Sequence, residues 1–142
     1  MVSLDLDLKA LSEANARRLV VAARLGFLAT FSAITVLSLI SGKVMSDINA
    51  FDVNDKIGHF IAYAWLSLFG MFATASPAIR LRGLLILALY GATLEAMQAL
   101  LGWDREGSFA DMLANMLGLA AGAGLALLVS RLMRDQATDK RQ

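Results

Sequence analysis

The chain has 142 residues, of which 58% are hydrophobic and 18% are charged, and its formal net charge is +1. Soluble domains carry about 25% charged residues, so this composition favours a single-domain membrane protein over a soluble one. The nearly neutral charge and the lack of a basic run argue against a nucleic-acid partner, and the absence of cysteine excludes disulfides, thiolate metal sites and a cysteine nucleophile.

Four apolar stretches, each long enough for a transmembrane helix, follow a polar segment at residues 1–18. We expect them to cross the membrane as helices at residues 19–41, 57–78, 83–101 and 108–132. Because no small-residue cleavage motif follows the first stretch, it is expected to stay as a span rather than act as a cleaved signal peptide. The predicted fold is all-α: an integral membrane bundle of four transmembrane helices, residues 19–132, with short loops.

The sequence also predicts where these helices end. Proline is readily accommodated at a helix margin, so Pro77 is expected to close the second span. Residues 78–82 would then form a short basic turn and residues 102–107 a charged one, while the polar tail, residues 133–142, is expected to fray. A G-x-x-x-G pattern at residues 118–122 permits a close approach between two helices.

The lysines and arginines are distributed unevenly between the two sides of the predicted bundle. Ten of the 13 belong to one side: Lys9, Arg17, Arg18, Arg24, Arg80, Arg82, Arg131, Arg134, Lys140 and Arg141. The other three belong to the opposite side: Lys43, Lys56 and Arg105. The positive-inside rule therefore predicts a multi-pass protein of the cell inner (cytoplasmic) membrane with both termini in the cytoplasm.

Polar residues interrupt the apolar stretches at the ends that would face outward. They comprise nine residues, called the polar cluster below: Asp55, Lys56, His59, Glu95, Gln98, Arg105, Ser108, Asp111 and Asn115. Spacings of three and four place several of them on common helix faces. Because ionisable residues in a membrane persist where they face a bundle interior or a wet cavity, the pattern predicts an outward-facing polar site.

The polar cluster also carries motifs that resemble those of the VanZ-like membrane proteins. The signature D-K-x-x-H-F-x-x-Y is matched by Asp55, Lys56, His59, Phe60 and Tyr63. The patterns G-x-x-x-E-x-x-Q and R-x-x-S-x-x-D-x-x-x-N-x-x-G are matched by Gly91, Glu95 and Gln98, and by Arg105, Ser108, Asp111, Asn115 and Gly118. The resemblance covers about residues 35–128 and implies a small four-span protein of the family named after a teicoplanin-resistance accessory factor. Because most members have no assigned activity, it does not imply resistance here.

Most of the polar cluster can also be explained without a ligand. The local explanations are a capping box at Ser108-x-x-Asp111, a helix cap at Asn54 and Asp55, an interhelical hydrogen bond by Asn115, a hydrogen-bonded helix position near the interface for His59, and a solvated turn position for Arg105. Glu95 is the exception, because it lies about 9 Å inside its span, where neither capping nor snorkelling accounts for it. It is expected either to pair with Arg105, Lys56 or His59 or to be held protonated by burial.

Three functions remain open, of which a binding module is favoured. Its partners would be membrane lipids: the polar cluster engages an outer-leaflet, lipid-linked envelope precursor, and Lys56 and Arg105 contact its phosphate or carboxylate. The resemblance adds an effect on glycopeptide susceptibility. The first alternative is a structural or assembly protein whose polar residues only fix helix packing. The second is an intramembrane enzyme in which Glu95, Asp111 and His59 act as acid–base residues or metal ligands.

Catalytic residues are not assigned, because no Ser-His-Asp order, HExxH motif or phosphate loop supports a named reaction. The balance is therefore against an enzyme. No cofactor or metal is expected, although a metal at the polar cluster and a homo-oligomer both stay open.

Overall fold

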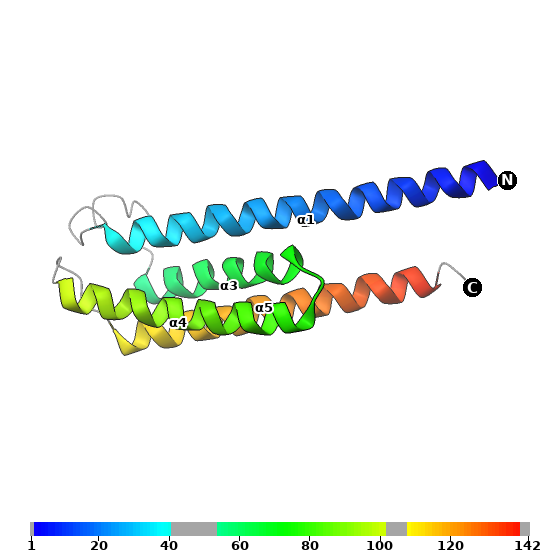
Figure 1. Ribbon diagram of the computed structural model, residues 1–142. Helices are drawn as coiled ribbons and strands as arrows, with labels where there is room; N and C mark the ends of the chain where they lie inside the picture. Colours follow the sequence, from blue (N-terminus) through cyan, green and yellow to red (C-terminus); the bar gives the residue numbers. More distant parts are fainter. Residues whose placement is uncertain (1, 41–53, 102–107, 140–142) are drawn as a thin grey trace.

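The structure, a computed structural model, describes residues 2–40, 54–101 and 108–139. This part of the chain forms four helices, α1 (Val2–Leu39), α3 (Asp55–Ala73), α4 (Pro77–Leu101) and α5 (Phe109–Asp139), and contains no strand. The helices lie side by side, and the start of α1 and the end of α5 lie at the same end of the bundle (Figure 1). The predicted all-α fold is confirmed.

The start of α3 follows from its sequence. Asn54 is the N-cap, and its side-chain oxygen accepts a hydrogen bond from the amide of Lys56 at 3.1 Å. Asp55 stands in the first turn, where a carboxylate interacts favourably with the positive end of the helix dipole. The expected cap at this position is therefore present.

The boundary between α3 and α4 corrects one prediction. The helix α3 ends at Ala73, and Pro77 is the first residue of α4 rather than the last of α3. Proline suits that position because its fixed φ matches a helix and its missing N–H would have no partner there. Ser76 precedes it, and its side-chain oxygen accepts from the amide of Ile79 at 3.5 Å. Residues 78–82, expected as a basic turn, are consequently helical.

The first and last helices, α1 and α5, are longer than expected. The polar segment at residues 2–18 continues into the first apolar stretch as one helix, α1. Helix α5 runs to Asp139, so the predicted fraying of the tail is not seen within the described residues. The predicted charged turn, residues 102–107, and most of the first loop, residues 41–53, lie outside the described residues.

Three of these helices are long and apolar enough to cross a membrane, over Glu13–Leu39, Pro77–Leu100 and Phe109–Gln136. Helix α3 is not among them. It has 19 residues, which give a length of about 28 Å, and its first five residues include Asp55, Lys56 and His59. The fourth crossing and the orientation of the termini stay predictions.

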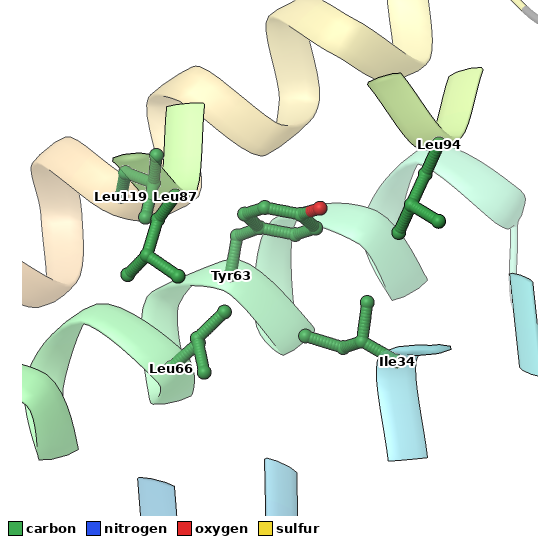
Figure 2. Close-up of a cluster of buried hydrophobic side chains, with 6 residues drawn as sticks. All are labelled: Ile34, Tyr63, Leu66, Leu87, Leu94 and Leu119. Atoms are coloured by element: carbon green, nitrogen blue, oxygen red, sulfur yellow. The ribbon is translucent and has the colours of Figure 1, made fainter. Parts of the chain in front are cut away.

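The distribution of side chains is that of a membrane bundle. A hydrophobic core joins all four helices through Ile34, Tyr63, Leu66, Leu87, Leu94 and Leu119 (Figure 2). Large apolar side chains also cover the outside: Leu89 is 69% exposed and Leu117 is 63% exposed. Meanwhile the polar side chains of Glu95 and Asn115 are buried. Leucine outside and carboxylate inside is the arrangement expected when lipid surrounds the protein.

Helix α3 is the centre of the bundle, because it has its most extensive contact with α5 and its next most extensive with α1. Gly118 and Gly122 of α5 face the backbone of α3 directly. The hydroxyl of Ser67 on α3 donates to the carbonyl oxygen of Leu119 on α5 at 2.8 Å. This close contact fixes the register between the two helices that carry most of the polar cluster.

Candidate functional site

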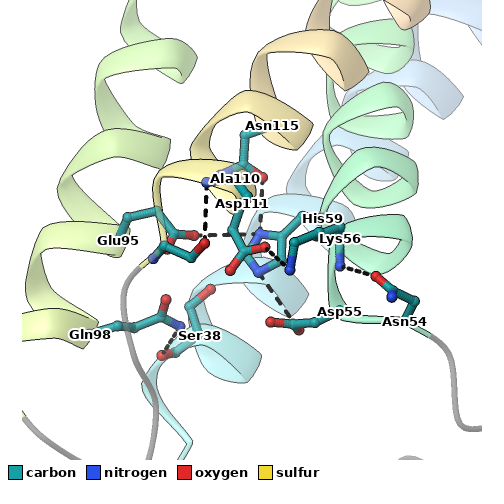
Figure 3. Close-up of polar contacts among 11 residues, drawn as sticks. Ser38, Asn54, Asp55, Lys56, His59, Glu95, Gln98, Ala110, Asp111 and Asn115 are labelled. Atoms are coloured by element: carbon teal, nitrogen blue, oxygen red, sulfur yellow. Dashed lines mark hydrogen bonds and ion pairs between the residues drawn. The ribbon is translucent and has the colours of Figure 1, made fainter.

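The polar cluster lies at the end of the bundle opposite the chain termini, where α1 and α4 end and α3 and α5 begin (Figures 1 and 3). Eight of its nine members are described, and they come from three helices and the N-cap of α5. Arg105 lies outside the described residues. The sequence-based grouping is therefore a grouping in space, with the position of Arg105 left as a prediction.

Glu95 of α4 is the residue that joins the helices at this end. Its Oε2 accepts a hydrogen bond from the backbone amide of Ser108 at 3.1 Å, and its Oε1 lies 3.6 Å from Nδ1 of His59. Of the three expected partners, His59 is confirmed for the described residues. The Ser108 amide was not expected. Through it, the carboxylate of one helix satisfies a free amide at the start of another, where the helix dipole favours a negative charge.

Ser108 caps α5, but the predicted capping box is incomplete. The Ser108 hydroxyl accepts from the amide of Ala110 at 3.2 Å, as a cap should. In a capping box the residue three positions later would bond back to the Ser108 amide. Glu95 holds that amide instead, so the Asp111 side chain is turned to another partner. The predicted capping box is therefore wrong. One of its two hydrogen bonds, the one to the Ser108 amide, is made by Glu95 of α4 instead of Asp111.

His59 is held on both sides of its ring. Its Nδ1 lies 3.0 Å from Oδ1 of Asn115, a side chain that is only 1% exposed, and its Nε2 lies 3.8 Å from Oδ1 of Asp55. The Asn115 oxygen and the nearby Glu95 carboxylate are both acceptors, which assigns the ring proton to Nδ1. The Nε2 lone pair of the neutral ring then points toward the Asp55 side.

Asp111 and Lys56 form an ion pair at the edge of the cluster. Lys56 Nζ lies 3.6 Å from Oδ1 of Asp111, and the side chains differ sharply in exposure, 54% for lysine and 6% for aspartate. The Asp111 Oδ1 accepts no hydrogen bond from any described residue. Its buried charge is therefore matched mainly by a half-exposed ammonium group.

Gln98 has a different role from the rest of the cluster. Its Nε2 donates to the backbone carbonyl of Ser38 at 3.0 Å, which ties the end of α4 to the end of α1 (Figure 3). A bond to a main-chain carbonyl of another helix explains the buried amide without a ligand. The hydrogen bond to Ser38 therefore gives Gln98 a role in helix packing.

Two features of the site were not predicted from sequence. The first is a cavity of about 140 Å³ between α1 and α3, bounded on its polar side by Ser38, Asp55, His59 and Tyr63 and on its apolar side by Ile34, Leu37 and Ala62. The second is the environment of Tyr63, a residue that the family signature already contains: its side chain is 2% exposed, and its hydroxyl has no hydrogen-bond partner among the described residues. Its position four residues after His59 places both side chains on one face of α3.

The charges of the cluster are unbalanced. Its described members include three carboxylates and one ammonium group, so their formal charge is −2 when the carboxylates are ionised and His59 is neutral. Arg105 would bring this to −1. Such a group of oxygens and one imidazole can bind cations or exchange protons, whereas an anion needs additional positive charge nearby.

The chain matches a model of a known protein family. The family model described as VanZ/LLP1 matches residues 9–130. This match contains every member of the polar cluster and begins well before residue 35, where the motif resemblance began. No curated protein and no solved structure matches the chain.

Proposed function

The chain belongs to the VanZ/LLP1 family, and we propose that it is a VanZ-like membrane protein that holds the headgroup of an outer-leaflet, lipid-linked envelope molecule at the polar cluster. The observation that carries this proposal is the cavity between α1 and α3. Its lining combines the polar side chains of Asp55 and His59 with apolar side chains, at one end of a bundle whose outer surface is apolar. A lipid likewise combines a polar headgroup with an apolar hydrocarbon tail.

The packing of the helices supports a fourth crossing by α3. Helix α3 begins at the end of the bundle where α1 stops and ends at the opposite end, where α4 begins (Figure 1). Since α1, α4 and α5 are each long and apolar enough to span, a neighbour that lies along them over the same depth is expected to span as well. The excess of lysine and arginine near the termini then places the polar cluster outside the cell.

This topology predicts the outcome of cysteine labelling in intact cells. A single cysteine at Asn54 should react with a membrane-impermeant maleimide, because it begins α3 at the outward end. Cysteines at Arg82 and Gln136, both exposed near the other end, should react only after the membrane is opened. The natural chain has no cysteine, which removes background labelling. Labelling of Arg82→Cys from outside would contradict the four-span arrangement.

The headgroup would be anchored by charge and the tail by apolar contact. Lys56 is half exposed at the cluster and can reach a phosphate, and Arg105, in the connection before α5, is the second candidate cation. The polyprenyl or acyl tail would run along the exposed leucines of the bundle. If this protein binds such a lipid at the outer surface, a lipid-anchored glycopeptide would have altered access to that lipid. The proposal therefore includes an effect on glycopeptide susceptibility.

Selective binding to the folded state predicts thermal stabilisation by a suitable lipid. Purified protein should unfold at a higher temperature with polyprenyl phosphate than with phosphatidic acid, which carries the same phosphomonoester on a different tail. At a concentration about 100 times its Kd, a ligand stabilises the folded state by about 2.7 kcal/mol. The shift would be measured by thermal unfolding in detergent, with each lipid added at equal concentration.

Matched variants make this test specific to the site. The variant Ala62→Leu fills the cavity, and Arg105→Ala removes a candidate phosphate contact, so both should lose most of the shift. Ala120→Leu adds the same volume at an exposed position of α5, and Arg131→Ala removes an exposed cation at the other end, so both should retain it. An equal response to the two lipids, or from all four variants, would contradict the binding proposal.

A structural role is the second candidate, and it has an observation in its favour. Glu95, Gln98 and Asn115 each have a partner on another helix, so these polar side chains could serve packing alone. A packing role predicts that no lipid outperforms a bulk phospholipid. For the enzyme alternative, Glu95 and His59 are in contact while Asp111 pairs with Lys56, and this arrangement assigns no reaction.

A further inference from the structure

Three residues of the polar cluster are arranged as metal ligands. Asp55, His59 and Asp111 each offer one ligand atom, and these atoms lie within 4.8 Å of one another. Two carboxylates and one imidazole are a ligand set suited to Zn²⁺ or Mn²⁺. Three protein ligands also leave an open coordination position. Two observations on these residues point to a bound cation.

The first such observation is the orientation of His59. A metal-binding histidine commonly uses one ring nitrogen for the metal and donates the other N–H to a carboxylate or carbonyl, which fixes the tautomer. Here Nδ1 faces Oδ1 of Asn115 at 3.0 Å and Oε1 of Glu95 at 3.6 Å. Nε2 faces the Asp55 carboxylate at 3.8 Å. The ring is therefore held with its Nε2 lone pair toward Asp55, and one ligand atom of Asp111 lies within 4.8 Å of the ligand atoms of Asp55 and His59.

The second observation is the state of Asp111. This residue is only 4% exposed, yet its Oδ1 accepts no hydrogen bond from any described residue. Its counter-charge is Lys56 Nζ at 3.6 Å, longer than a hydrogen bond and borne by a half-exposed side chain. A buried carboxylate oxygen is costly without a closer partner. Lys56 is thus the counter-ion of Asp111 (Figure 3). A cation that binds the carboxylate more closely would displace its half-exposed side chain.

We propose that Asp55, His59 and Asp111 bind one divalent metal ion of the Zn²⁺ or Mn²⁺ class, in competition with the ammonium group of Lys56. Asn115 and Glu95 act as positioning residues that orient the His59 ring. The ion changes the formal charge of the described cluster from −2 to neutral and releases Lys56, so a phosphate oxygen can occupy the open coordination position. This last step rests on the proposed function, whereas metal binding itself does not.

Direct binding tests the site. Protein purified without a polyhistidine tag and treated with chelator would be titrated with Zn²⁺ by calorimetry. His59 is the only histidine, so ¹⁵N-histidine labelling gives a single pair of ring resonances. We expect one bound ion per chain, a large shift of Nε2, and an Nδ1 that stays protonated. No saturable binding, or a shift confined to Nδ1, would overturn the proposal.

Four variants separate a metal site from a set of ion pairs. Asp55→Asn and Asp111→Asn remove ligands, so each should weaken Zn²⁺ binding by at least about tenfold, and Glu95→Gln should weaken it by about tenfold through the ring orientation. Lys56→Met removes the competing cation and should tighten binding. Asp135→Asn, an exposed change on the same helix as Asp111, is the control and should have no effect. Equal affinity across all five proteins would reject the site even if some Zn²⁺ binds.

Measuring lipid stabilisation with and without the metal distinguishes this inference from the proposed function. Thermal stabilisation by polyprenyl phosphate would be measured with Zn²⁺ and with chelator. We expect the stabilisation to need the ion. If chelated protein is stabilised equally, the bridging step is wrong and the proposed function stands. If Zn²⁺ binds as expected but no lipid stabilises the protein, the metal site stands and the proposed function fails.

Discussion

Replacing Gly122 with alanine should break the contact between α3 and α5, whereas the same change at Gly124 should not. A Cβ at Gly122 would collide with the carbonyl oxygen of Ala64 and would lie 3.0 Å from the amide nitrogen of Leu68. Both atoms belong to the backbone of α3, so no side-chain rotation can relieve the overlap. A Cβ at Gly124 meets nothing within 4 Å.

The expected cost of Gly122→Ala is about 3 kcal/mol, the upper end for an overpacked contact, because two helices must move apart. That movement also threatens the bond from Ser67 to Leu119 at 2.8 Å and the contact of His59 with Asn115 at 3.0 Å. Gly124→Ala should be neutral or stabilising by up to about 1 kcal/mol, since alanine favours a helix more than glycine does. The two variants thus make the same glycine-to-alanine change and differ only in whether the added Cβ meets another helix.

Thermal unfolding in detergent, followed by circular dichroism, checks this expectation, and size-exclusion chromatography reports whether each variant stays monodisperse. Gly118→Ala serves as a second test, because a Cβ there would meet the carbonyl oxygen of Phe60 and lie 3.1 Å from the amide nitrogen of Ala64. If Gly122→Ala and Gly124→Ala unfold at the same temperature, the close packing of α3 against α5 is contradicted.

This packing was one of the features that sequence could predict. The G-x-x-x-G spacing needed only the helix period to place both glycines on one face. The same period predicted that Glu95, Asp111, Asn115 and His59 would turn inward, and the structure brings them together. Polar residues within apolar stretches are informative because exposure to lipid is costly, so they face the interior of the bundle or a water-filled cavity.

The features that sequence missed depend on contacts between different helices. The bond from Glu95 to the Ser108 amide competes with a local capping box and wins only because α4 ends beside the start of α5. Gln98 binds a main-chain carbonyl of Ser38, which no side-chain pattern reveals. Pro77 suits either a helix end or a helix start, and the local rules alone did not decide between them.

Replacing Glu95 should separate a packing role from a role for its charge. In Glu95→Leu, the amide of Ser108 loses its acceptor and His59 loses a neighbouring carboxylate. A buried amide without a partner costs about 1 to 3 kcal/mol, so this variant should unfold at a clearly lower temperature. In Glu95→Gln, the side-chain oxygen can still accept from Ser108 and keep α5 capped. Its stability should therefore fall by less than about 1 kcal/mol.

The two readouts then give opposite answers for the two roles. If the negative charge acts in binding, Glu95→Gln should keep most of its stability and yet lose stabilisation by polyprenyl phosphate, because an amide replaces the carboxylate that holds the His59 ring in its orientation. If Glu95 only packs helices together, Glu95→Gln should respond to the lipid as the natural protein does. Glu13→Gln, an exposed change on α1, controls for the loss of one carboxylate. A full lipid response in Glu95→Gln would leave helix packing as the role of this intramembrane carboxylate, since the Ser108 bond alone would then account for its burial.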